Sequence, residues 1–209
     1  MDEPFSGLDP LIRRQMRLEL VELQKGVHKT IVFITHDLDE AVTVGDRIAI
    51  MRDGEIIQMG TPQDIVMRPA DDFVREFTLG VQKTKVLHAG SVASKPDVIV
   101  KDSDTVETLR SLMGGSDSAY AICVEDQGTF KGLIRRETVD GIKPSEKKPL
   151  RSYFDQSVEV ISSDTILEDL LPTLIDSDHP VPVIDKENRC IGVATRRDVL
   201  RVIASESDD

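Results

Sequence analysis

The sequence contains a repeat at a constant spacing, and few patterns limit the possible folds as strongly. Residues 103–106 (Ser-Asp-Thr-Val) recur as residues 163–166 (Ser-Asp-Thr-Ile), and residues 132–134 (Gly-Leu-Ile) recur as residues 192–194 (Gly-Val-Ala), in both cases 60 positions later. A displacement that stays constant over such a distance indicates a duplicated supersecondary unit. The second part of the chain is therefore predicted to contain two copies of one fold.

Each copy has the pattern strand, helix, strand, strand, helix. In the first copy we expect a strand at 98–100, a capped helix with the apolar stripe Leu109, Leu112 and Met113, a buried strand at 121–124, a strand entering Gly132 and a helix from about Glu137. In the second copy the same elements are a strand at 158–161, a helix with the stripe Ile166, Leu170, Leu171 and Leu174, a buried strand at 181–184, a strand entering Gly192 and a helix from about Arg197. Pro172 should kink its helix or end it early, because proline cannot donate the helical hydrogen bond.

This β-α-β-β-α unit, its spacing and the strand at 179–185 (His-Pro-Val-Pro-Val-Ile-Asp) resemble CBS domains. Two CBS domains pair into one module, so the resemblance implies a tandem CBS pair. We place the first repeat at residues 86–145 and the second at 146–205, followed by an acidic tail at 206–209.

The first ten residues contain adjacent carboxylates, Asp2 and Glu3, followed by a Ser-Gly turn and an Asp-Pro pair that should begin a helix. Adjacent carboxylates suit phosphoryl chemistry, because one can hold Mg²⁺ while the other orients or deprotonates a water. An isolated pair of this kind is more often solvated surface. Here residues 2–10 closely resemble the end of the Walker B strand and the D-loop of ABC transporter ATPases, and residues 34–37 (Ile-Thr-His-Asp) resemble their switch-histidine segment.

The resemblance covers about residues 1–80. Residues 45–62 are close to the family pattern, and residues 69–77 look like the subgroup that imports glycine betaine, proline and related quaternary amines. The resemblance implies that Glu3 is the general base and that His36 senses the γ-phosphate; otherwise His36 would be interpreted as a capping or core histidine. The implied ATP-binding residues are Asp2, Ser6 and Asp9, with Asp2 as the Mg²⁺ ligand.

Two parts of such an ATPase are absent from this sequence. It has no Gly-x-x-x-x-Gly-Lys-Ser/Thr loop, whose backbone N–H groups and lysine bind phosphates, and no Ser-Gly-Gly-Gln signature. We therefore expect the C-terminal part of a longer ATPase subunit that cannot hydrolyse ATP by itself, with Met1 either an internal methionine or the start of a truncated gene.

The fold class expected for the whole chain is mixed α/β and α+β, an ABC ATPase remnant followed by the CBS pair. In the remnant, residues 1–80, we predict helices at 10–26, 38–44, from Pro62 and at 71–77, a buried strand at 30–35, and a hairpin of strands 47–51 and 55–59 around Asp53-Gly54. Having lost its neighbouring strands, it should be marginal, rearranged or supported by a second copy. Residues 81–85 are a predicted linker.

A possible ligand site lies in the second repeat. CBS pairs that bind adenine nucleotides carry a Gly-x-x-Thr/Ser-x-x-Asp segment, which is complete as Gly192, Thr195 and Asp198. In the first repeat Arg135 and Thr138 replace the hydroxyl and carboxylate residues. At most one conventional site is therefore encoded, and a simple helix cap explains Thr195 and Asp198 equally well.

Several arginines accompany this segment. They could serve an anionic ligand such as AMP, ATP or cyclic di-AMP, with Arg196 as a binding residue, or they could form a solvated face; the group is Arg135, Arg136, Arg196, Arg197 and Arg201. Arg197 and Arg201 share a helix face. Near an anionic membrane each arginine contributes about 1 kcal/mol, which salt screens, so the pair could also sense ionic strength.

Composition excludes some functions. A formal net charge of −12 argues against a general nucleic-acid binder. No apolar run approaches the roughly 20 residues needed to span a bilayer. Cys123 and Cys190 are isolated among apolar residues, which is typical of buried small hydrophobes in a reducing cytosol.

Two functional interpretations remain open at this point. The first is the regulatory C-terminal portion of a glycine betaine/proline-type ATPase subunit, cytoplasmic and peripheral on the membrane, with ATP and Mg²⁺ bound in the full subunit. Its partners would be a second copy, a permease, a substrate-binding protein and an anionic lipid surface. The second is a free-standing CBS nucleotide sensor with a non-catalytic N-terminal dimerisation arm. A competent ATPase is excluded by the absent phosphate loop.

Overall fold

The computed structural model describes residues 1–204 apart from 28, 144, 145 and 147. The chain divides into two compact units, Met1–Val86 and Leu87–Asp209, which are described separately. Among the described residues, no helix has both the length and the apolar character needed to cross a membrane.

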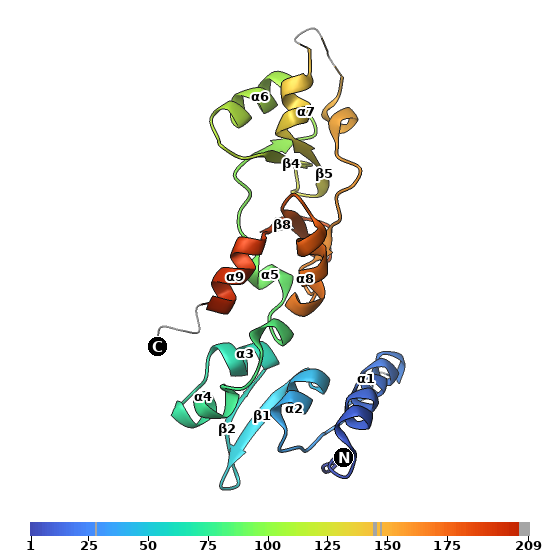
Figure 1. Cartoon of the computed structure of the whole chain (residues 1–209), viewed down its shortest axis with the longest axis vertical. Coiled ribbons are helices and arrows are strands. Elements are labelled where there is room, and N and C mark those ends of the chain that lie inside the picture. The colour runs from blue at the N-terminus through green and yellow to red at the C-terminus, as the bar shows by residue number, and fades with distance from the viewer. Residues whose placement is uncertain (28, 144–145, 147, 205–209) are drawn as a thin grey trace. The chain divides into compact units, whose positions relative to one another are not determined.

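The first unit contains a β-hairpin, the long helix α1 and several shorter helices (Figure 1). Its elements are α1 (Pro10–Val27), α2 (Leu38–Val44), β1 (Ile48–Arg52), β2 (Glu55–Gly60), α3 (Pro62–Met67), α4 (Asp72–Thr78) and a 3₁₀ turn at Lys83–Lys85. Asp53 and Gly54 join the antiparallel strands with φ values of 53° and 83°. That left-handed backbone is what a tight hairpin turn requires.

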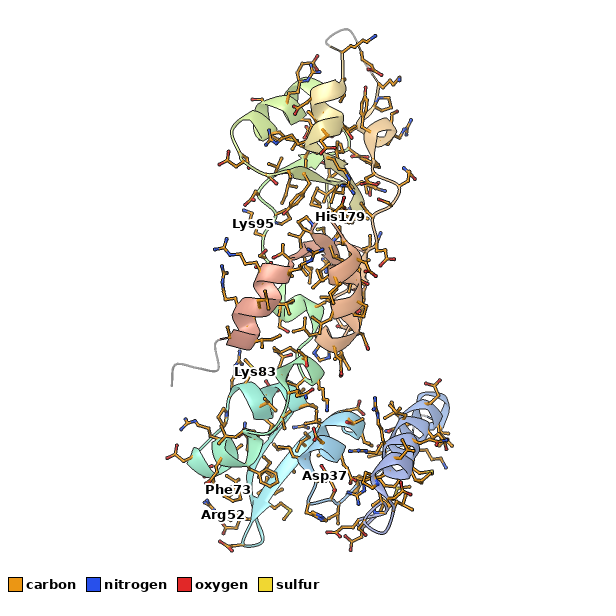
Figure 2. All side chains as sticks on the ribbon, viewed as in Figure 1. Asp37, Arg52, Phe73, Lys83, Lys95 and His179 are labelled. Carbon is orange, nitrogen blue, oxygen red and sulfur yellow. The ribbon has the colours of Figure 1, made fainter. Side chains whose placement is uncertain are left out.

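Side chains at the starts of the helices explain where they begin. Thr61 and Asp64 form a reciprocal capping box at α3, while Asp37 and Asp71 accept backbone hydrogen bonds at α2 and α4. At the hairpin, the Arg52 guanidinium lies 4.8 Å from the centre of the Phe73 ring on α4 (Figure 2). This cation–π contact ties the hairpin to α4.

The prediction of a buried strand at residues 30–35 is wrong. The structure has only an isolated bridge there, between Asp2 and Ile34, and the side chains of Val32 and Ile34 are 72% and 55% exposed. A strand needs a hydrogen-bonded partner along its length, and residues 1–3 are the short segment that pairs with it. On α1, six apolar residues are likewise exposed: Leu11, Ile12, Met16, Leu18, Leu23 and Val27.

The second unit contains two three-stranded sheets, β3-β4-β5 and β6-β7-β8. Its elements are α5 (Ala89–Val92), β3 (Ile99–Lys101), α6 (Val106–Gly114), β4 (Tyr120–Val124), β5 (Phe130–Arg135), α7 (Arg136–Gly141), a 3₁₀ turn at Leu150–Tyr153, β6 (Ile161–Ser162), α8 (Leu167–Asp176), β7 (Val181–Ile184), β8 (Cys190–Ala194) and α9 (Arg196–Ala204). In each sheet the first pair is parallel and the second antiparallel.

The duplication predicted from the sequence is confirmed by this topology. The register shifts at Cys123/Val124 in one sheet and at Val183/Ile184 in the other, again 60 positions apart. Thr129 forms a bridge with Arg189, its own counterpart, so the two hairpin turns pair with each other about an approximate twofold axis.

Alternate residues of β4 enter two different cores. Ala121 and Cys123 are fully buried with α6, while Ile122 packs with Leu133 and with Val193 of the other repeat. Burial raises the pKa of the Cys123 thiol to about 12, which makes it inert, as expected for a small hydrophobe. Figure 1 shows α6 and α7 side by side against β4 and β5.

Pro172 does not end its helix early, which was one of the two outcomes expected from the sequence. Helix α8 continues through it to Asp176. Leu170 is fully buried and Leu174 is 3% exposed, on either side of the proline. Burial of several leucines, at about 1.5–3 kcal/mol each, offsets the roughly 3 kcal/mol that a proline inside a helix costs through its lost hydrogen bond and ring clash.

Each repeat has a glycine over which another segment crosses. A Cβ on Gly132 would lie 2.5 Å from Cγ of Phe154, and a Cβ on Gly192 would lie 2.7 Å from the Ser94 carbonyl oxygen. Since Ser94 and Phe154 are themselves 60 positions apart, the crossing belongs to the duplicated fold.

Gly132→Ala is expected to lower the free energy of unfolding of the second unit by about 1–3 kcal/mol, because the added methyl overpacks against Phe154. Urea unfolding followed by tyrosine fluorescence reports this unit alone, since the chain has two tyrosines, Tyr120 and Tyr153, and no tryptophan. Gly141→Ala, where nothing lies within 4 Å, is the matched control and should cause no loss. Equal losses in both variants would contradict the packing described.

Candidate functional sites

Glu3 and His36 meet in the first unit. The pairing of residues 1–3 with residues 32–34 brings the two side chains together, and Nδ1 of His36 lies 2.8 Å from Oε1 of Glu3. Glu3 has a φ of 42°, a strained value for a glutamate. The two residues line a small hollow with Ser6, Arg13, Thr35, Asp37 and Glu40.

The Glu3 carboxylate raises the pKa of His36 above its usual 6.5, first through the hydrogen bond and then through its charge. A raised folded-state pKa means that the contact stabilises the fold below about pH 6.5 and that this contribution disappears as the pH rises through the folded value. The contact with Glu3 therefore favours the protonated form of His36.

The other predicted residues of this loop have local roles. The Ser6 hydroxyl donates to the Glu3 carbonyl oxygen at 3.0 Å, and Asp9 Oδ1 accepts from the backbone N–H groups of Leu11 and Ile12 at 3.1 and 3.2 Å. Asp9 thus caps α1 as predicted from the Asp-Pro pair. Ser6 closes the turn that follows Glu3.

The first unit does not by itself offer a magnesium site. Asp2 is exposed, and its backbone bridges to Ile34. Among the residues that the structure describes, no group of three or more His, Cys, Asp or Glu side chains could hold a metal ion. Mg²⁺ is normally held by one or two carboxylates together with substrate phosphates and water, so Asp2 alone could contribute one ligand at most.

Sequence reasoning gave no role to four residues of the hollow, Arg13, Thr35, Asp37 and Glu40. Glu40 is only 4% exposed, and its Oε2 accepts a hydrogen bond from Thr35 Oγ1 at 2.8 Å. Arg13 lies 3.8 Å away on α1. These residue types are common at helix starts, and only the tertiary contact between α1 and α2 reveals them.

In the second unit, Thr195 and Asp198 form a reciprocal cap at the start of α9. Asp198 Oδ2 accepts from Thr195 N and Oγ1 at 3.1 and 2.5 Å, and Asp198 N donates to Thr195 Oγ1 at 3.1 Å. The Ser94 hydroxyl adds a contact to the same oxygen at 3.4 Å. The helix cap anticipated from the sequence is present, and Gly192 lies beneath the crossing Ser94 segment.

Arg196 is engaged in the fold. Its guanidinium donates to the carbonyl oxygens of Leu174, Ile175 and Ser177 at the end of α8, at 2.6–2.9 Å. Arg136, 60 positions earlier, makes the equivalent bonds to Met113, Ser116 and Ser118. Both arginines satisfy carbonyls that a helix end leaves unpaired, which argues against Arg196 as a ligand-binding residue.

Comparisons with known proteins agree with both parts of the chain. The CBS domain family matches residues 150–205. The chain is 36% identical, over 99% of its length, to the glycine betaine/proline betaine transport system ATP-binding protein ProV of Salmonella typhimurium, of which it covers 52%. It is also 36% identical, over 100% of its length, to the glycine betaine transport ATP-binding protein OpuAA of Bacillus subtilis, of which it covers 49%.

The chain is a homologue of ATP-binding subunits of betaine ABC transporters. It spans about half the length of these relatives. Its fold is similar to the cystathionine beta-synthase (CBS) pair domain of a Shewanella oneidensis protein, with a TM-score of 0.52 and 20% identity over 58% of this chain and 72% of that one. The predicted combination of an ABC subunit sequence with a CBS-pair fold is confirmed.

The first repeat of the CBS pair has an ion-pair cluster where the second has the Thr195 cap. Arg135 forms a short hydrogen bond through Nε to Asp155, and its Nη1 and Nη2 lie 2.8 and 2.9 Å from the two oxygens of Asp178. Asp155 precedes β6 and Asp178 follows α8, so the guanidinium joins three segments. Thr138, the counterpart of Asp198, is exposed.

Two arginines of α9 remain outside such contacts. Arg197 and Arg201 are exposed, and neither has a partner among the residues that the structure describes. Of the arginines considered in the sequence analysis, Arg197 and Arg201 are therefore the two whose guanidinium groups are available to bind an anionic ligand.

Arg135→Ala is expected to lower the free energy of unfolding of the CBS pair by about 1–2 kcal/mol, because it leaves the Asp155 carboxylate, 15% exposed, without its cation. Hydrogen bonds from Ser157 and then Arg135 hold the pKa of Asp155 well below its usual range. That stabilisation is present above about pH 4 and is lost as the pH falls, so wild type and variant should converge in acid. Urea unfolding by tyrosine fluorescence at several pH values measures this, with Arg197→Ala as the control.

Proposed function

We propose that this chain is the regulatory C-terminal portion of the ATPase subunit of a glycine betaine/proline-type osmolyte importer. The observation that carries the proposal is the 2.8 Å contact between Glu3 and His36, two residues 33 positions apart that the family resemblance names independently as base and switch histidine. In the full subunit, ATP hydrolysis drives uptake, and the CBS pair adjusts that activity.

The chain's own residues define what each would do. Glu3 accepts a proton from the attacking water, and His36, held against Glu3 through Nδ1, presents its other ring nitrogen to the terminal phosphate. Ser6 and Asp9 keep the intervening loop in place. ATP bound in the full subunit would supply the phosphoryl group, and Asp2 would contribute one ligand to its Mg²⁺.

The free-standing sensor is the less favoured alternative. The similarity to transporter subunits runs over 99% of the chain and so includes the first unit, which a dimerisation arm would not require. The proposed partners are a permease, a substrate-binding protein and a second copy of the subunit, at the inner face of the membrane.

Uptake of labelled glycine betaine, by a transporter whose ATPase subunit contains this chain, tests the proposal. Glu3→Gln is expected to reduce the uptake rate by about 10²–10⁴-fold, the usual contribution of a general base, and His36→Ala should also reduce it strongly. Glu55→Gln, an exposed carboxylate on β2, is the control. Normal uptake with Glu3→Gln would refute the proposed role.

For the CBS pair we propose an adenine nucleotide or cyclic dinucleotide at Gly192, Thr195 and Asp198. The start of α9 offers N–H groups and a hydroxyl to phosphate, and the Asp198 carboxylate could bond ribose hydroxyls. The rival is ionic strength, sensed through Arg197 and Arg201 at an anionic lipid surface. Their exposure is the observation that favours this second mechanism.

Calorimetry of the whole chain with AMP, ATP and cyclic di-AMP separates the two mechanisms. A nucleotide sensor should give saturable heat with at least one of them, Asp198→Asn should weaken it at least tenfold, and Thr138→Ala at the matching first-repeat position should not. Absence of heat with all three would leave salt sensing. In that case Arg197→Ala with Arg201→Ala should shift the salt threshold of uptake, whereas an unchanged threshold would exclude it.

A further inference from the structure

Arg13 lies where two segments of the first unit meet. It is the fourth residue of α1, and its Nη2 donates a hydrogen bond to the Leu8 carbonyl oxygen at 3.1 Å. The same guanidinium faces α2, with Nη1 3.9 Å from Asp37 Oδ2 and Nε 3.8 Å from Glu40 Oε1. Figure 2 labels Asp37 at the start of α2. One side chain therefore contacts the loop that follows Glu3 and the helix that follows His36.

On the α2 side, the contact leads to the backbone around His36. Glu40 is buried, and its carboxylate is held by Thr35 Oγ1, which in turn accepts a hydrogen bond from the backbone N–H of Asp37 at 3.0 Å. A buried carboxylate needs a nearby cation or hydrogen bonds, and Arg13 is that cation. Because Thr35 and Asp37 flank His36, this network holds the chain on both sides of the histidine.

On the loop side, the contact secures the segment that positions Glu3. Ser6 donates to the Glu3 carbonyl oxygen through both N–H and hydroxyl, and Leu8 N–H donates to the Phe5 carbonyl oxygen at 3.1 Å. The Leu8 carbonyl oxygen then accepts from Arg13. A glutamate keeps a φ of 42° only where surrounding contacts impose it, and this loop is the structure that does so.

The neighbouring arginine provides a contrast. Arg14 is exposed and has no partner among the described residues, although it differs from Arg13 by one position. The Nε of Arg13, in contrast, is buried and makes no hydrogen bond in this geometry. The buried Nε–H of Arg13 lies 3.8 Å from the Glu40 carboxylate, and a contact of this length can shorten to a hydrogen bond when a site binds its substrate.

We propose that Arg13 is a positioning residue for the site of Glu3 and His36. By holding the Leu8 carbonyl and facing the Glu40 carboxylate with one guanidinium, it keeps the two side chains in contact. The inference rests on the proposed function, because the spacing of Glu3 and His36 matters for hydrolysis only if both serve it. Arginine is required, since lysine lacks the planar fork that reaches two acceptors at once.

Imidazole ¹⁵N spectra of the whole chain at one neutral pH test this without nucleotide. The His36 Nδ1 resonance should show the hydrogen bond to the Glu3 carboxylate, and Arg13→Ala should shift it to the position of a free imidazole. Arg13→Lys should restore the fold but not the shift. Arg14→Ala is the matched control and should leave the spectrum unchanged.

Arg13→Ala leaves Glu40 buried without a cation and could unfold the first unit. The double variant Arg13→Met with Glu40→Leu removes both charges, so it should fold, as judged by circular dichroism, and still lose the His36 signal. A retained His36 signal in this folded variant, or its loss in Arg14→Ala, would overturn the proposal. The result does not depend on hydrolysis, so the uptake test and this test can fail separately.

Discussion

The second unit depends on an exchange of segments between its two repeats. The start of the first repeat, before β3, pairs with the second repeat: Ser94 exchanges backbone hydrogen bonds with Val193, and Ala89 and Gly90 donate to carbonyls at residues 165 and 163. The start of the second repeat, before β6, packs on the first, where Phe154 covers Gly132. Neither repeat is complete by itself, and a single methyl group at either glycine would disturb the exchange.

Features that depend on local sequence patterns could be predicted, whereas features that depend on tertiary contacts, such as this exchange, could not. The repeat and the order of its strands and helices are local patterns, and they were predicted correctly. The strand at residues 30–35 was not, because an apolar run becomes a strand only with a partner alongside, and only residues 1–3 are there. The course of α8 through Pro172 also depended on tertiary burial.

The candidate sites show the same difference between what local motifs predict and what only tertiary contacts reveal. Glu3 and His36 each belong to a family motif, so both could be named from the sequence, whereas their contact across 33 positions is a finding of the structure. Arg13 and Glu40 carry none. Among the arginines, residue type suggested an anion site, but Arg136 and Arg196 bind carbonyls at the ends of the preceding helices. Charge in a sequence does not reveal whether its partner is a ligand or a helix end.

The difference between the two repeats has a physical consequence for the binding of an anionic ligand. At the first repeat, Arg135 already has two carboxylates as partners, so an anionic ligand would have to displace them. At the second, Asp198 is linked through the Ser94 hydroxyl to the segment that continues directly from the first unit. A ligand that bound through Asp198 would therefore have to break its contacts with Thr195 and Ser94. The duplication thus leaves the first repeat with a cluster of ion pairs where the second has a helix cap.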